Sequence, residues 1–224
     1  MGNKKIAALT FDDGPNTTTT VQVLDMLEKH GVTASFFVCG DNITPQTAEI
    51  MRRAVKIGCD IQNHSRTHSD MTKMSNEDII AEINFTSDAI KTAVGKHPEF
   101  FRPPYIAVNN IMHDLTDLTF IQGVGAEDYI DDVSAEERYR RIMAQVSDGT
   151  IILLHDMEGN FRTVDALDMI IPALKEEGYR LVTVSQLFSE KGIIPKRGFL
   201  YTNVLQTEAY YYSKQEKSCK ISEL

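Results

Sequence analysis

The chain has 224 residues, and 42% of them are hydrophobic, so it can bury a sizeable core in one domain. Its formal net charge is −9, with 23 basic and 32 acidic residues, and the basic residues form no cluster, which argues against a nucleic-acid partner. The sequence has no apolar run long enough for a transmembrane helix, and no repeat or linker that would mark a second domain.

Strand and helix patterns alternate along the chain. We predict strands at Lys5–Phe11, Thr33–Val38, Asp60–Gln62, Phe100–Arg102, Leu118–Gln122, Thr150–Leu154 and Arg180–Val184. Two of the intervening helices are well delimited: Asn76–Val94 follows a capping-box-like Ser75, and Val164–Glu177 contains Pro172, which should bend it. Alternation of this kind implies parallel strands, and about seven strands predict an α/β fold, a distorted or incomplete (β/α) barrel.

The first polar motif, TFDDGP at residues 10–15, places two adjacent carboxylates where the first predicted strand ends. Neighbouring residues of an extended backbone point in opposite directions, so we expect Asp12 and Asp13 to face different ways. One of them can then bind a metal while the other moves a proton. Taken alone, the motif also fits a surface turn.

The second motif is HSRTH at residues 64–68. A spacing of four predicts that His64 and His68 share one face of a helical turn, as two ligands of one ion require. Adding Asp13 gives two histidines and one carboxylate, a set that leaves positions open for water and substrate and is typical of a catalytic metal. Without that third ligand, a pair of exposed polar histidines is the alternative.

The third motif, RPPY at residues 102–105, follows a short apolar segment. Arg102 carries a permanently charged planar fork, which could hold the Asp12 carboxylate ionised and oriented. The paired prolines restrict the backbone, so the Tyr105 amide could be a preset oxyanion donor.

The last motif, LLHD at residues 153–156, places His155 where a buried strand ends. A histidine there can donate a proton to a leaving group if a carboxylate raises its pKa. Asp128 is the first candidate for that carboxylate. Asp156 ranks lower because it can instead cap the loop that follows.

These motifs, in this order, resemble the polysaccharide deacetylases of carbohydrate esterase family 4, the NodB-homology domain. The resemblance implies one catalytic domain over residues 1–224, with its core at about 6–188 and a tail at 203–224 to which we assign no role. It implies that Asp12 is the base, positioned by Arg102, and that His155 is the acid, tuned by Asp128. It also implies that Asp13, His64 and His68 bind the metal and that the Tyr105 backbone amide donates to the oxyanion.

One segment departs from the family pattern DxxDW, because Gly125 and Tyr129 stand where its first Asp and its Trp would be. Tyr129, with Leu153, is expected to line the substrate pocket. This segment looks most like the acetylxylan esterase branch, which implies O-deacetylation of xylan or xylo-oligosaccharides. N-deacetylation of chitin oligomers or peptidoglycan is the alternative, and a non-catalytic glycan-binding domain is a second one.

The implied cofactor is one divalent metal ion; two nitrogen donors and one oxygen donor suit zinc, and cobalt or nickel would also fit. The implied partner is an acetylated glycan, with no nucleic acid, no membrane and an open oligomeric state. Family members usually act on external glycans, yet the first predicted strand begins too close to Met1 for a signal peptide. We therefore expect a catalytic domain trimmed from a secreted protein, or else a cytoplasmic enzyme. Cys39, Cys59 and Cys219 imply no disulfide framework, and the first two should be buried.

Overall fold

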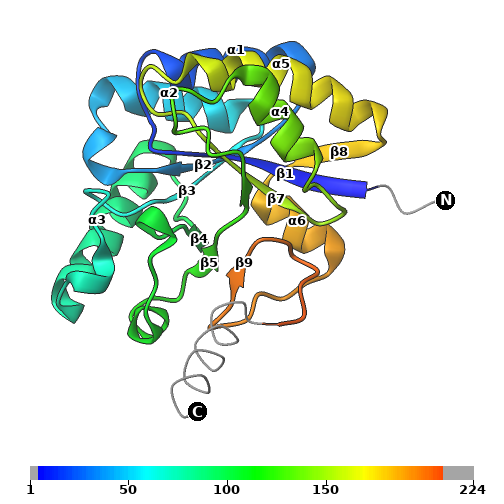
Figure 1. Ribbon diagram of the computed structural model, residues 1–224. Helices are drawn as coiled ribbons and strands as arrows, with labels where there is room; N and C mark the ends of the chain where they lie inside the picture. The colour runs from blue at the N-terminus through cyan, green and yellow to red at the C-terminus, as the bar shows by residue number, and fades with distance from the viewer. Residues whose placement is uncertain (1–4, 209–224) are drawn as a thin grey trace.

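The computed structural model of the protein describes residues 5–208. A curved parallel sheet forms its centre, and α1, α2, α4 and α5 lie along one side of it (Figure 1). The strands are β1 (Lys5–Asp12), β2 (Ser35–Val38), β3 (Asp60–Asn63), β4 (Phe100–Phe101), β5 (Thr119–Ile121), β6 (Val124–Gly125), β7 (Ile151–His155), β8 (Tyr179–Val182) and β9 (Leu200–Tyr201). The α-helices are α1 (Thr19–His30), α2 (Pro45–Lys56), α3 (Asn76–Val94), α4 (Ala135–Met143), α5 (Phe161–Glu176) and α6 (Val184–Lys191).

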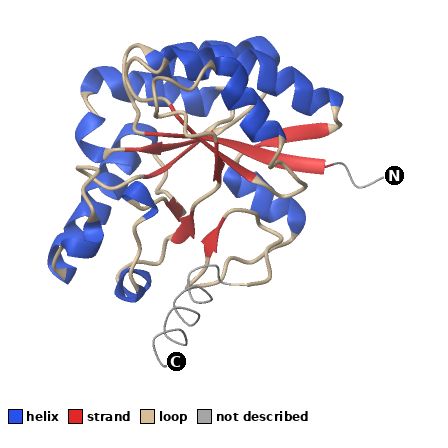
Figure 2. Ribbon diagram, viewed as in Figure 1, coloured by secondary structure: helices blue, strands red, loops and turns tan. Residues whose placement is uncertain are grey.

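The sheet runs in the order β6-β7-β1-β2-β3-β4-β5-β9, and β8 pairs with β1 outside this path. All of these pairs are parallel, as the alternation of strands and helices predicted. The strands gather in the middle of the molecule with helices around them (Figure 2). Because the path ends at β6 and β9, the barrel is incomplete, and the predicted fold class is confirmed.

The prediction of seven strands was too low, since the structure has nine among the residues it describes. The two that were missed, β6 and β9, contain two residues each, too few for an alternating pattern to stand out. The last predicted strand also extended too far, because Val184 begins α6 under a capping box made by Thr183 and Gln186.

The predicted helix at Asn76–Val94 is confirmed in both limits: the Ser75 side chain accepts the amide proton of Asp78, and Gly95 ends the helix at φ 81°. The second predicted helix begins three residues earlier than expected and contains Pro172. The main hydrophobic core lies between the sheet and the helices that cover it, chiefly α1, α2 and α5, and it contains Cys59. Cys39 is buried as well, so both expectations for these thiols are confirmed.

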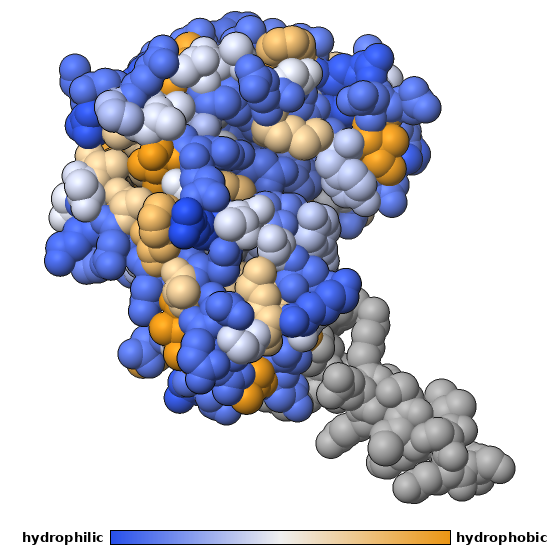
Figure 3. All heavy atoms as spheres, turned by 90° about the vertical axis from the view of Figure 1, so that its left-hand side faces the viewer, coloured by the Kyte–Doolittle hydropathy of each residue, from blue (hydrophilic) through white to orange (hydrophobic). Residues whose placement is uncertain are grey.

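Part of the predicted tail packs on the barrel. Val204 is 1% exposed, and Asn203 forms an antiparallel bridge with Thr150. Residues 209–224, which include three consecutive tyrosines and Cys219, lie outside the described residues. Hydrophilic residues dominate the face drawn in Figure 3, with smaller hydrophobic groups between them. Within residues 5–208, no helix is both long and apolar enough to cross a bilayer.

Candidate active site

The predicted polar residues meet at the carboxyl ends of the central strands. Asp12 is the last residue of β1 and His155 the last of β7, and the two are register partners across the sheet. His64 directly follows β3, and Arg102 directly follows β4. Parallel strands expose their carboxyl ends at one edge, which explains why motifs so distant in sequence converge. A cavity of about 640 Å³ opens there.

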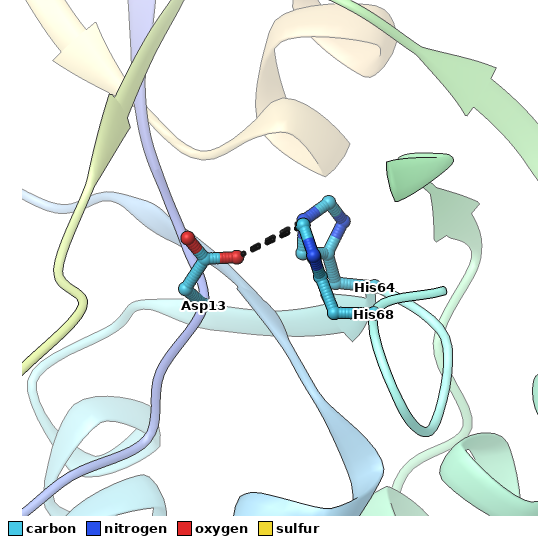
Figure 4. Close-up of side chains that lie close together, drawn as sticks. All are labelled: Asp13, His64 and His68. Atoms are coloured by element: carbon cyan, nitrogen blue, oxygen red, sulfur yellow. Dashed lines mark ion pairs between the residues drawn. The ribbon is translucent and has the colours of Figure 1, made fainter. Parts of the chain in front are cut away.

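Asp13, His64 and His68 form one cluster, whose ligand atoms all lie within 4.8 Å of one another. The Asp13 carboxylate points toward the two imidazole rings (Figure 4), and its Oδ1 lies 3.3 Å from Nε2 of each histidine. That Oδ1 is buried and has no hydrogen-bond partner among the described residues. A buried carboxylate oxygen without a partner, beside two imidazole nitrogens, is what a site for a divalent cation would present.

The hydrogen bond of His64 and the pKa shifts of the other two side chains favour metal binding. His64 Nδ1 lies 2.7 Å from the carbonyl oxygen of Arg102, to which it must donate, so in the neutral imidazole Nε2 carries the lone pair. Burial lowers the pKa of His68, as does the neighbouring His64, which favours a neutral imidazole. Burial alone would raise the pKa of Asp13, but its contacts with the histidines outweigh this and lower the pKa to about 2.

The expectation of a helical turn at residues 64–68 was wrong, because these residues form an irregular loop after β3. Ser65 and His68 adopt left-handed φ values of 65° and 56°, which non-glycine residues rarely do. Two side chains hold the loop in this shape. Asn63 accepts the Ser65 amide at 2.8 Å, and Glu82 of α3 accepts the amides of Arg66 and Thr67, both at 2.9 Å.

The expectation that Asp12 and Asp13 alternate on an extended backbone was also wrong, since Asp13 has φ 76° and lies beyond the strand. Asp156 shapes this bend rather than its own following loop. Its side chain accepts the Gly14 amide at 3.1 Å and the Thr20 hydroxyl at 2.5 Å. A Cβ at position 14 would lie 2.5 Å from Asp156 Oδ2, so the glycine is needed for this close approach.

The predicted pairing of Asp12 with Arg102 is present. Arg102 Nη1 donates to Asp12 Oδ1 at 2.5 Å, and both side chains are buried. The guanidinium also lies over the ring of Phe37, at 4.1 Å from its centre. Asp12 Oδ2 is 3.7 Å from His64 Nε2, so this carboxylate lies beside the metal cluster and faces the cavity.

The predicted pairing of His155 with Asp128 is also present. Asp128 Oδ1 lies 2.8 Å from His155 Nδ1, and its Oδ2 accepts the backbone amide of His155 at the same distance. Burial opposes protonation of His155, but the hydrogen bond and charge of Asp128 outweigh it and raise the pKa to about 9. His155 can therefore carry a proton at neutral pH.

The remaining predicted residues line the same cavity. Tyr105, Tyr129 and Leu153 all contribute to its wall, and Tyr105 is 70% exposed. The ring of Tyr129 meets that of His155 edge-on, with centres 5.6 Å apart. Sequence reasoning missed Gln122, whose buried Oε1 has no partner in the described part of the chain and which also lines this cavity. A glutamine after a short strand gives no signal in the sequence.

Comparison with known proteins identifies this arrangement. The sequence profile of the polysaccharide deacetylase family matches residues 1–122. The crystal structure of the Xyl-CE4 domain of a multidomain xylanase, from the hindgut metagenome of Trinervitermes trinervoides, is 49% identical with a TM-score of 0.88; the match covers 90% of this chain and 98% of that one. The chain belongs to the polysaccharide deacetylase family.

Other family members agree with this. A family 4 acetyl xylan esterase from Clostridium thermocellum, in complex with a cobalt ion, is 41% identical with a TM-score of 0.88, and the match covers 90% of this chain and all 100% of that one. A bifunctional xylanase/deacetylase of Pseudobutyrivibrio xylanivorans is 50% identical over 203 residues, and the match covers 90% of this chain but 34% of that protein. Peptidoglycan-N-acetylmuramic acid deacetylase PdaC of Bacillus subtilis is 40% identical, with 83% and 39% covered. The chain therefore spans between about a third and two fifths of the length of these curated relatives.

Proposed function

We propose that this protein is a metal-dependent deacetylase that removes O-acetyl groups from xylan or xylo-oligosaccharides. The observation that carries the proposal is the meeting of three groups at one cavity: the metal-ligand cluster, the Asp12–Arg102 pair and the His155–Asp128 pair. The first could hold an ion, the second could take a proton and the third could give one. Metal-assisted hydrolysis of an acyl group uses each of these.

The ligands of the ion would be Asp13, His64 and His68, and their two nitrogens and one oxygen fit it. We propose zinc, which this donor set suits, and cobalt or nickel would fit the same donors. When bound, the ion would polarise the acetyl carbonyl and lower the pKa of a water molecule.

Asp12 is the proposed base. Its Oδ1 is held by Arg102, so Oδ2 is the oxygen left to take the proton of the attacking water. The oxygen of that water bonds to the acetyl carbon, and the Tyr105 amide would donate to the developing oxyanion. The bond from the acetyl carbon to the sugar oxygen then breaks, and His155 delivers its proton to that oxygen while Asp128 holds Nδ1. The products are acetate and a free sugar hydroxyl.

The choice of an ester on xylan rests on the relatives. Those named for xylan are 41% to 50% identical to this chain, whereas PdaC, named for peptidoglycan, is 40% identical. Tyr129, at 55% exposed, would offer a smaller and more polar ring to the sugar than a tryptophan would. A polymeric substrate of this kind would place the protein outside the cell.

The test is acetate release, measured in parallel from acetylated xylo-oligosaccharides, chitin oligomers and peptidoglycan with the metal-loaded protein. We expect the highest kcat/KM on the xylo-oligosaccharides, and loss of turnover when a chelator removes the ion. An equal or higher value on chitin oligomers would replace the ester assignment with the N-deacetylase alternative. Glycan binding without acetate release from any substrate would support the non-catalytic alternative.

A further inference from the structure

Arg138, in α4, is a buried cation in an unusual environment. It is 1% exposed, and its guanidinium contacts only neutral groups among the described residues. Two of these are backbone carbonyls, of Val133 at 2.9 Å and Ile130 at 3.2 Å. The other two are side chains of the segment that follows β7: Nη1 donates to Asn160 Oδ1 at 2.5 Å and to Thr163 Oγ1 at 2.8 Å. Burying a charge without a directly paired carboxylate is costly, which indicates that the contacts of Arg138 serve a purpose.

The contacts of Arg138 fix the direction of the next hydrogen bonds. A guanidinium can only donate, so the Thr163 oxygen accepts from Arg138 and its single hydroxyl proton remains for another acceptor. That acceptor is Asp128 Oδ2, at 2.7 Å. In the same way, Arg138 occupies Oδ1 of Asn160, which turns the Nδ2 of this amide toward the carbonyl of His155 at 2.9 Å and toward Asp128 Oδ2 at 3.4 Å.

Thr163 and Asn160 therefore orient the Asp128 carboxylate. Its Oδ2 receives the Thr163 hydroxyl and the His155 backbone amide, which leaves Oδ1 to meet His155 Nδ1 at 2.8 Å. We propose that Arg138 is a positioning residue for the His155–Asp128 pair, acting through Thr163 and Asn160. This inference rests on the proposed function, in which His155 protonates the departing sugar oxygen.

Leaving-group dependence can separate this role from a merely structural one. A sugar alkoxide is a poor leaving group and needs a proton from the acid, whereas 4-nitrophenolate leaves unaided. A change that only loosens the fold or the metal site slows both reactions alike. A change that misaligns His155 slows the sugar ester more than the aryl ester.

The decisive variant is Thr163→Val, which removes the hydroxyl link at similar side-chain size. We expect kcat on acetylated xylo-oligosaccharides to fall roughly ten-fold, with KM nearly unchanged, and kcat on 4-nitrophenyl acetate to fall much less. Thr163→Ser, which restores the hydroxyl, should recover most of the loss. Thr92→Val removes an exposed hydroxyl in α3 and serves as the matched control. Metal content should equal that of the wild type in all three variants.

Arg138→Met is the second test. Where this variant folds, it should show the same selective loss as Thr163→Val, and the two changes combined should cost little more than either alone. Where it does not fold, Thr163→Val still decides. Equal losses on both esters in Thr163→Val, or no loss on either, would overturn the proposal. Absence of acetate release by the wild-type protein from every glycan would instead overturn the proposed function.

Discussion

The proposed metal-ligand half of the site and its proposed proton-donating half are held by different kinds of structure. Two of the ligands, Asp13 and His68, lie in loops with left-handed backbone, and their side chains are 22% and 30% exposed. His155 and Asp128 are 14% and 0% exposed, and three further side chains form a buried network behind them. The first half depends on loops held in strained shapes, and the second on packing between α4 and α5.

Arg102 links the proposed metal-ligand half to the proposed base. Its side chain pairs with Asp12, while its backbone carbonyl accepts the His64 Nδ1 proton. One residue thus orients both the proposed proton acceptor and a proposed metal ligand. Damage to the loop supports should therefore change metal affinity first, whereas damage to the buried network should change proton transfer. The following experiments test that separation.

The largest expected effects come from the two adjacent aspartates. Asp12→Asn should keep the metal, because Asp12 is not in the ligand cluster, yet lower kcat by about 10²–10⁴ through loss of the base. Asp13→Asn should chiefly lower metal occupancy. Metal content per protein, measured after gel filtration and alongside kcat, separates the two. The reverse pattern would mean that the two roles are exchanged.

Much of this site could be predicted from the sequence, because its chemical groups stand at strand ends in short motifs. Asp12, Asp13, Arg102 and His155 all lie at or next to the carboxyl end of a strand, as their motifs predicted. The shape of their loops could not be predicted in this way. The four-residue spacing of the HSRTH motif suggested a helical turn, but Glu82, sixteen positions from Arg66 in sequence, captures the loop amides instead.

The side chains that support the site could not be predicted from the sequence either. Arg138 belongs to the run EERYRR in α4, which in sequence looks like a solvated charged face. Only the packing of α4 against α5 shows that this one arginine is buried while Arg140 stays exposed. Asp156 was ranked as a loop cap for a similar reason, since its partners Gly14 and Thr20 are far away in the chain.

Glu82 offers a sharper test of the metal-ligand half. Glu82→Ala leaves the amides of Arg66 and Thr67 without their acceptor, so the loop should lose its shape and His68 its position. Changes to groups that orient metal ligands typically cost 10–100-fold in affinity, and we expect about ten-fold here, measured by competition with a chelator. Glu82→Gln keeps one acceptor oxygen and should bind more tightly than Glu82→Ala. If Glu82→Ala binds metal like the wild type but loses activity selectively on sugar esters, the separation of the two halves fails.

The last expected effect concerns pH and the proposed proton-donating half. The pKa of His155 is raised to about 9, mainly by Asp128 acting against burial, so the protonated acid is present at neutral pH and is lost as pH rises. A bound divalent cation disfavours the imidazolium, so in the loaded protein the basic limb should lie at or below that value. One pH unit above the limb, about a tenth of the acid remains protonated, and kcat/KM on acetylated xylo-oligosaccharides should fall roughly ten-fold. On 4-nitrophenyl acetate the fall should be smaller, because 4-nitrophenolate needs no proton.

Asp128→Asn removes the charge that raises the pKa of His155, so it should move the basic limb to lower pH for the sugar ester. Identical basic limbs for both esters would show that His155 is not the group that limits activity at high pH.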